Sequence, residues 1–152
     1  MEEPAWSALS TNAQALYPWL KLEWRGPDAN NNGKIRLSVR QAADRIGVSI
    51  NTAAEAFRDL QRKGFIVVRE PACLGLDGAA KSPAYELTEL KMPGAEGHGR
   101  RLYKQWRLEQ EFPVAKAPIH NPTGRNGKKT CHQKEDDTVI NFETKTREPS
   151  QK

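Results

Sequence analysis

The stretch IRLSVRQAADRIGVSINTAAEAFRDLQRKGFIVV, residues 35–68, has the clearest local pattern in this chain of 152 residues. Ser38 with Gln41 three positions later is a capping-box pattern, which predicts that a helix begins directly after Ser38. Apolar residues then recur at helical spacing as far as Gly47, which predicts the end of the helix. These apolar residues are Val39, Ala42, Ala43 and Ile46.

A second helix is predicted directly after the first. Ser49 is a good N-cap, and Gly64 is a good terminator of the helix that follows Ser49. The apolar positions between them repeat the helical spacing and are Ala53, Ala56, Phe57 and Leu60. The stretch therefore predicts two short helices, each with one apolar face, joined by the tight turn Gly47-Val48-Ser49.

An earlier helix is predicted near the start of the chain. Ser10 or Thr11 can cap a helix that runs to about Trp24 and carries apolar residues on one side. Pro18 lies inside this helix and removes a backbone hydrogen bond to Gln14, so we expect a kink or a split there.

Strand patterns flank the two central helices. Residues 25–33, RGPDANNNG, predict a polar loop, because Gly, Pro, Asp and Asn favour turns. Residues 34–37 predict a short strand with Ile35 and Leu37 on one face. Residues 65–68 are apolar and β-branched, residues 69–82 predict a long turn, and residues 84–90 alternate as a return strand. The last three segments predict a hairpin with a wide tip.

Helix, tight turn, helix and hairpin form the layout of a winged helix-turn-helix, so the predicted fold class is mainly α with a small β-hairpin wing, an α+β fold. We predict this domain over residues 8–90. Residues 91–112 predict a linker with a short accessory helix near 100–110, and residues 113–152 predict a disordered basic tail. In the accessory segment, Leu102, Tyr103 and Trp106 either fold back on the domain or form a peptide that docks on a partner.

The stretch LSVRQAADRIGVSINTAAEAFRDLQRKGFIV resembles the DNA-binding domain of the GntR group of bacterial repressors. The resemblance lies in a Ser-led helix, a Gly-Val-Ser turn, Asn-Thr, Glu-Ala, and then Leu and Gly before the wing, over about residues 34–90. The N-terminal segment, the NNNGKIRLSV entry and the YKQW segment are more similar to uncharacterised bacterial helix-turn-helix proteins. This second resemblance implies a fold and no particular process.

The resemblance implies DNA contacts on the start of the first helix and on the outward face of the second. Carried over, these residues are Arg40, Ser49, Ile50, Asn51, Thr52, Ala54 and Arg58. Ile50 and Ala54 depart from the pattern, because the repressors usually have Arg there. Asn51 could bond adenine, Arg58 could reach guanine or phosphate, and the two apolar residues could touch a thymine methyl.

Positive charge is concentrated in residues 34–69 and in the C-terminal part of the chain. Residues 1–90 hold 11 basic and 11 acidic residues, whereas residues 91–152 hold 13 basic and 8 acidic residues, a net charge of +5. Residues 34–69 hold 8 basic and 3 acidic residues, a local charge of +5. The simplest interpretation of the basic side chains in residues 34–69 is a solvated face, on which some of them contact phosphate. Candidate phosphate contacts are Arg36, Arg62 and, near the wing tip, Lys81.

The titratable residues do not predict an enzyme. Asp44, Glu55 and Asp59 could be mistaken for a carboxylate site, but Arg58 and Arg62 flank Glu55 and Asp59, which favours surface ion pairs for these two. The histidines and the two cysteines show no triad, disulfide or zinc pattern, so no cofactor, metal or small-molecule ligand is expected. No stretch has the length of a membrane span and no secretory signal is evident, which predicts a cytoplasmic protein without a membrane partner.

Double-stranded DNA is thus the expected partner, and the expected role is transcriptional regulation or control of a mobile element. A protein-interaction adaptor built on the same fold is the alternative. Dimers are common for this motif, so a homodimer is an open alternative, although no dimerisation helix is evident after the wing.

Overall fold

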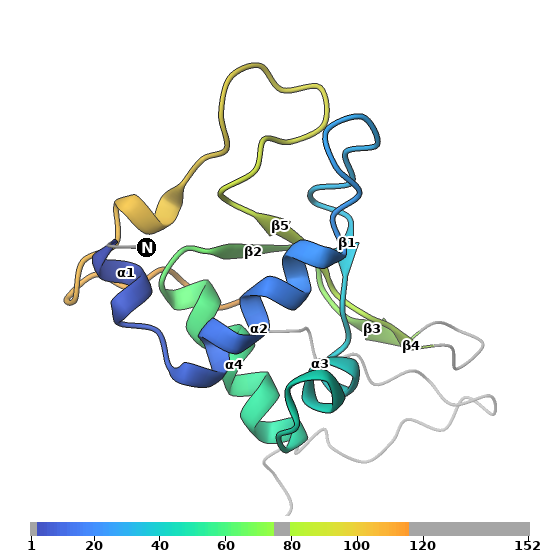
Figure 1. The fold of residues 1–152 in the computed structure, drawn as a ribbon, viewed down its shortest axis with the longest axis vertical. Helices are drawn as coiled ribbons and strands as arrows, with labels where there is room; N and C mark the ends of the chain where they lie inside the picture. The colour runs from blue at the N-terminus through green and yellow to red at the C-terminus, as the bar shows by residue number, and fades with distance from the viewer. Residues whose placement is uncertain (1–2, 75–79, 116–152) are drawn as a thin grey trace, which may run out of the picture. The chain divides into compact units, whose positions relative to one another are not determined.

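The computed structural model describes residues 3–74 and 80–115 as a small α+β unit of helices and a three-stranded antiparallel sheet (Figure 1). Three helices carry most of the packing: α2 (Thr11–Leu22), α3 (Val39–Ile46) and α4 (Ile50–Arg62). A short helix, α1 (Pro4–Ser7), precedes them and was not predicted. Helix α2 packs against α3 and α4, and α4 packs against the sheet.

The central strand of the sheet is the last strand along the described part of the chain. Strand β5 (Ala84–Leu87) lies between β1 (Ile35–Arg36) and β2 (Ile66–Glu70), and both neighbours run antiparallel to it. Strands β3 (Cys73–Leu74) and β4 (Ala80–Lys81) pair as a separate two-stranded ladder. This ladder corrects the predicted long turn over residues 69–82, because the hairpin continues past β2. The predicted return strand ends at Leu87 rather than at residue 90.

The predicted split of α2 at Pro18 is wrong, because one continuous helix passes through this residue. Ser10 caps the helix and its hydroxyl accepts a hydrogen bond from the Ala13 amide at 3.3 Å. Pro18 is exposed, whereas Leu16 and Leu20 are fully buried on the opposite side. Packing of the buried side therefore holds the helix together despite the missing backbone hydrogen bond.

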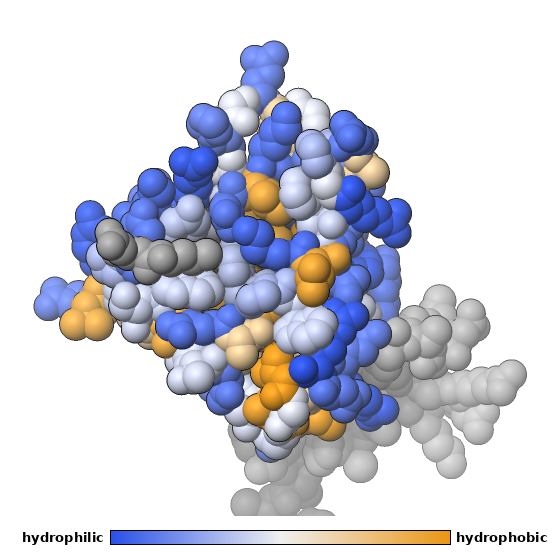
Figure 2. All heavy atoms as spheres, viewed as in Figure 1, coloured by the Kyte–Doolittle hydropathy of each residue, from blue (hydrophilic) through white to orange (hydrophobic). Residues whose placement is uncertain are grey.

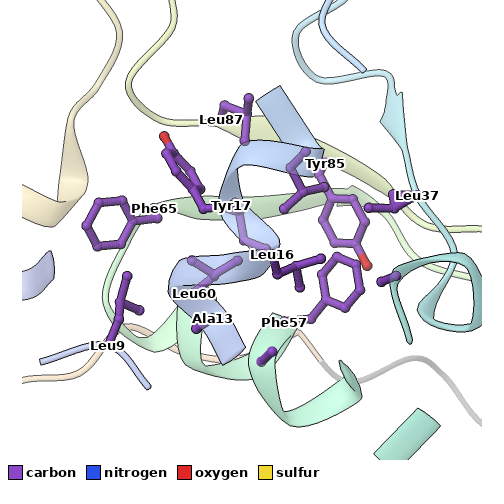
Figure 3. Packing of buried hydrophobic residues seen from close by; sticks show 14 of the residues in the cluster. Leu9, Ala13, Leu16, Tyr17, Leu37, Phe57, Leu60, Phe65, Tyr85 and Leu87 are labelled. Atoms are coloured by element: carbon purple, nitrogen blue, oxygen red, sulfur yellow. The ribbon is translucent and has the colours of Figure 1, made fainter. Parts of the chain in front are cut away.

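The core lies between α2, α4 and the sheet (Figure 3). Tyr17 meets Phe65 edge to face at 5.4 Å, and Phe57 stacks on Tyr85 with ring centroids 5.0 Å apart. As the 34–37 strand pattern predicted, Ile35 and Leu37 are both buried, with 0% and 1% exposure. The apolar faces of the helices thus close on one face of the sheet.

The predicted polar loop before β1 is anchored by its asparagines. The buried Asn32 side chain accepts a hydrogen bond from the Leu87 amide at 2.8 Å and donates to the Leu90 carbonyl at 2.9 Å. Asn30 accepts a hydrogen bond from the Trp24 indole at 3.0 Å. The Asn32 side chain thus bonds one backbone group at the end of β5 and another beyond it, which ties the loop to the sheet.

The segment after the sheet folds back on the domain, although the predicted accessory helix is reduced to the 3₁₀ turn η1 (Leu102–Lys104). Tyr103 stacks on Phe65 with centroids 4.8 Å apart. Trp106 is only 6% exposed and lies in the core cluster. Of the two alternatives for this segment, folding back is confirmed. Most of the predicted disordered tail, from residue 116 onward, lies outside the described residues.

Candidate nucleic-acid interface

The start of α3 and the turn between α3 and α4 are fixed by the residues that predicted them. The Ser38 hydroxyl accepts a hydrogen bond from the Gln41 amide at 3.2 Å, and the Gln41 side chain accepts one from the Ser38 amide at 3.1 Å. Gly47 has φ of 68°, a left-handed conformation that ends α3. The Ser49 hydroxyl then accepts a hydrogen bond from the Thr52 amide at 3.1 Å and caps α4. The capping and turn predictions are confirmed.

Helix α4 divides into an inward and an outward face. The inward residues are buried, as predicted, and are Ala53, Ala56, Phe57 and Leu60. On the outward face Ile50 is 51% exposed, Asn51 and Arg58 are exposed, and Ala54 and Thr52 are half-buried. Side chains with hydrogen-bonding groups and an exposed apolar residue therefore share the start of this face. In Figure 2, apolar surface gathers over the lower part of the molecule, where α3 and the start of α4 lie in Figure 1.

The two arginines of α4 share one carboxylate. Arg58 Nη1 lies 2.8 Å from Glu55 Oε2, and Arg62 Nη2 lies 2.6 Å from Glu55 Oε1. Hydrogen bonds from Arg58 and then Arg62 hold the pKa of the Glu55 carboxyl below its ordinary value. The predicted surface pairing of Glu55 is confirmed. Both arginines therefore have an alternative acceptor on their own helix.

A second shared carboxylate lies where β2 ends and the β3–β4 ladder begins. Arg36 forms an ion pair with Glu70 and donates to the Ser82 carbonyl, and Lys81 Nζ lies 3.3 Å from the same Glu70 carboxylate. Arg40 on α3 is exposed and has no ion pair within residues 3–74 and 80–115. The structure thus brings Arg36 and Lys81 together at the hairpin, whereas the other candidate residues lie on α3 and α4.

Acidic residues from elsewhere in the chain offset part of the local charge of +5. Among the 8 basic residues of the stretch 34–69, only Lys34 and Arg40 have no ion pair in the described part of the chain. Glu23 pairs with Arg45 at 2.6 Å, and Glu86 pairs with Arg69 at 2.6 Å. The region is therefore a face of paired charges rather than an uncompensated positive patch.

The predictions that Asp59 and Lys63 lie on the surface are wrong. Asp59 is 8% exposed and Lys63 is 7% exposed, and their carboxylate and ammonium groups lie 2.7 Å apart. Asp59 also accepts a hydrogen bond from the Ser10 amide at 2.8 Å, and the Lys63 ammonium lies 5.7 Å from the Trp106 ring centroid. The returning segment and the start of α2 cover this pair, which no local pattern could indicate.

A further buried carboxylate escaped the sequence analysis. Glu86 on β5 has 0% exposure, and its two oxygens accept hydrogen bonds from Arg100 at 2.9 and 2.8 Å. Arg69 pairs with the same carboxylate. Because a buried carboxylate needs such partners, this cluster fixes the segment after the sheet to the sheet itself.

A groove of about 610 Å³ runs beside the outward face of α4. Ala54, Arg58 and Arg62 of α4 form one side of it. Most of its lining is apolar and comes from α3, β2, the start of the hairpin extension, β5 and residues 114–115: Val39, Val68, Pro71, Ala72, Pro83, Tyr85, Val114 and Ala115. Three residues of the proposed contact set, Ala54, Arg58 and Arg62, thus border an apolar depression.

Within the described residues there is no group of three or more His, Cys, Asp or Glu side chains able to hold a metal ion. None of the described helices is long and apolar enough to cross a membrane. Comparisons with protein-family models, with curated proteins and with solved structures give no match to this chain.

Proposed function

We propose that this chain is a non-enzymatic protein that binds double-stranded DNA through a winged helix-turn-helix, with α4 as the reading helix. The observation that carries the proposal is the outward face of α4, which bears the exposed side chains of Ile50, Asn51 and Arg58 and follows a capped, tight turn from α3. A helix presented in this way fits the major groove. The resemblance to the GntR DNA-binding domain supports the same assignment.

Each outward residue has a suitable partner on DNA. Asn51 can form two hydrogen bonds to adenine, and Ile50 and Ala54 can contact a thymine methyl. The Ser49 and Thr52 hydroxyls form a hydrogen bond with each other at 2.8 Å at the start of α4. These hydroxyls hold the cap and can in addition contact phosphate. Arg58 is the candidate for guanine or phosphate.

The basic residues around this face fit phosphate contacts. Arg40 is exposed in the first turn of α3, whereas Arg36 on β1 and Lys81 on β4 meet at Glu70 on the hairpin that would act as the wing. The ion pairs of Arg58, Arg36 and Lys81 are exposed, and exposed pairs contribute only about 0 to 1 kcal/mol. Such pairs can therefore be exchanged for phosphate at low cost.

Regulation of transcription, or control of a mobile element, is the role that such a domain most directly supports. Selection from a random pool of duplexes would first define the preferred sequence. Asn51→Ala should then reduce the free energy of binding to that sequence by about 1 to 3 kcal/mol and relax the selection of the base at one position. Arg62→Ala, which removes a phosphate contact at most, should weaken binding to preferred and scrambled duplexes by the same amount.

Both variants would be compared at matched salt after their melting temperatures are shown to equal that of the wild type. Equal losses on preferred and scrambled duplexes for both variants would contradict the assignment of α4 as the reading helix. The contrast between the two variants is needed because loss of any basic or polar residue can weaken binding nonspecifically.

A protein-interaction adaptor is the second candidate, and the apolar groove beside α4 favours it, together with the pairing of most basic residues in the stretch 34–69. The two functions differ in their salt dependence. A DNA-binding protein should lose affinity for a labelled duplex steeply as salt increases from about 50 to 200 mM. An adaptor should show no salt-dependent duplex binding at all.

A further inference from the structure

The groove beside α4 is bordered at one end by the last described residues of the chain. The Phe112 amide donates a hydrogen bond to the Arg62 carbonyl at 2.8 Å, and the Ala115 amide donates to Gln61 Oε1 at 3.0 Å. Phe112 also packs against the core cluster and lies against Gly64. The chain is therefore anchored at the C-terminal end of α4 and then enters the groove at Val114 and Ala115.

The residues that follow are within reach of the rest of the groove. Gln61 and Ala54 are seven positions apart on α4, which corresponds to about 10 Å at 1.5 Å per residue. An extended chain advances about 3.3 to 3.6 Å per residue. Three to four residues beyond Ala115 therefore suffice to reach Ala54, and these residues are Lys116, Ala117, Pro118 and Ile119.

The composition of this short segment matches the groove lining. Ala117, Pro118 and Ile119 are consecutive apolar residues, and Ile119 is the only branched aliphatic residue between Lys116 and Thr138. Pro118 disfavours a helical conformation for Ala117, so the segment is biased toward an extended form suited to a groove. The lining it would meet is mostly apolar and includes Val39 and Val68.

We infer that the groove is a docking site for residues 117–119 of the same chain. Chain continuity makes the effective concentration of this segment at the groove far higher than that of any separate peptide. Once docked, the segment covers Ala54 and Arg58 on the outward face of α4. The consequence for DNA, which rests on the proposed function, is that the docked form competes with duplex for these two residues.

The docking is tested on the full chain by methyl NMR without DNA. The expected result is a set of NOEs between the Ile119 methyls and the methyls of Val39, Ala54 and Val68. Ile119→Ser should remove these NOEs and shift the three groove resonances, while the matched variant Ile140→Ser in the distal tail leaves them unchanged. Both variants should melt at the wild-type temperature.

Absence of the NOEs, with no shift in Ile119→Ser, would overturn the docking. So would NOEs that occur only between differently labelled molecules in a mixed sample, because the occupant would then be a second copy.

Duplex binding gives the second readout. If about nine-tenths of the molecules are docked, the apparent affinity for duplex is weakened about ten-fold. Ile119→Ser should therefore tighten duplex binding about ten-fold, and Ile140→Ser should not. Equal affinities of wild type and Ile119→Ser would overturn the competition. Because the NOE experiment contains no DNA, failure of every protein to bind duplex would contradict the proposed function and leave the docking result standing.

Discussion

Replacement of Asp59 by Asn is the most informative perturbation of the folded unit, because this carboxylate joins three parts of the chain. It accepts the Ser10 amide at the start of α2 and pairs with Lys63, whose ammonium lies by the Trp106 ring of the returning segment. Asp59→Asn keeps the size of the side chain and removes its charge. The Lys63 ammonium would then remain buried without its closest counter-ion.

The expected loss in the free energy of unfolding is about 2 to 3 kcal/mol. Removal of one partner from a buried pair typically costs about 3 to 5 kcal/mol, because an uncompensated charge is left inside. Two features reduce this loss here. Glu111 lies 3.9 Å from Lys63 and remains as a second acid, and the Asn side chain can still accept the Ser10 amide.

The pH dependence gives an independent check. Burial raises the pKa of Asp59, but the hydrogen bonds from Lys63 and Ser10 outweigh it and hold the pKa below its ordinary value. A depressed folded-state pKa means that the charged form stabilises the fold above the unfolded pKa of about 3.9, and that this stability is lost as the pH falls through the folded value. The difference between wild type and Asp59→Asn should therefore be full at pH 7 and shrink below about pH 4.

Urea unfolding monitored by tryptophan fluorescence would measure these differences. Asp44→Asn is the matched control, because Asp44 is exposed and has no ion pair in the part of the chain that is described, so its change should stay within about 0.5 kcal/mol. Lys63→Met in the Asp59→Asn background should restore part of the stability. A loss below about 1 kcal/mol at pH 7, or equal losses at pH 7 and below pH 4, would refute this account of the pair.

Two further variants test the core and the paired arginines. Phe57→Ala should cost about 3 kcal/mol, at the low end for a buried aromatic because Phe57 borders the groove as well as stacking on Tyr85; an unchanged melting temperature would show that the ring does not support the core. Glu55→Gln should free both arginines of α4, tighten binding to unrelated duplexes and steepen the salt dependence by about one to two phosphate contacts. Glu109→Gln, at an exposed position, is its control, and equal salt slopes for the two variants would contradict the role given to Glu55.

The parts of the fold that were predicted are those encoded by neighbouring residues. Ser38, Gln41, Gly47 and Ser49 act within one helical turn of their own position, so their capping and turn geometry follows directly from the sequence. The inward face of α4 follows for the same reason, because helical periodicity assigns it without reference to the rest of the chain.

The parts that were missed depend on residues far apart in the sequence. Helix α1 has only four residues and is too short to be stable alone, but it packs against η1 about a hundred residues later. The buried Glu86 carboxylate is compensated by ion pairs with Arg69 and Arg100. Neither partner could be assigned to that carboxylate before the strand order and the path of the returning segment were known.

The charge of the candidate interface depends on the same long-range contacts. Glu23 and Glu70 lie outside the stretch 34–69, yet they pair with Arg45 and Arg36 and reduce the positive charge of that stretch. An uncompensated patch would bind any duplex mainly through counterion release. Weak, exposed pairs are exchanged for phosphate at low cost, but this exchange takes place on any duplex whatever its sequence. Discrimination between sequences must then come mainly from groups such as Asn51, whose exposed side chain has no hydrogen-bond partner within the described residues.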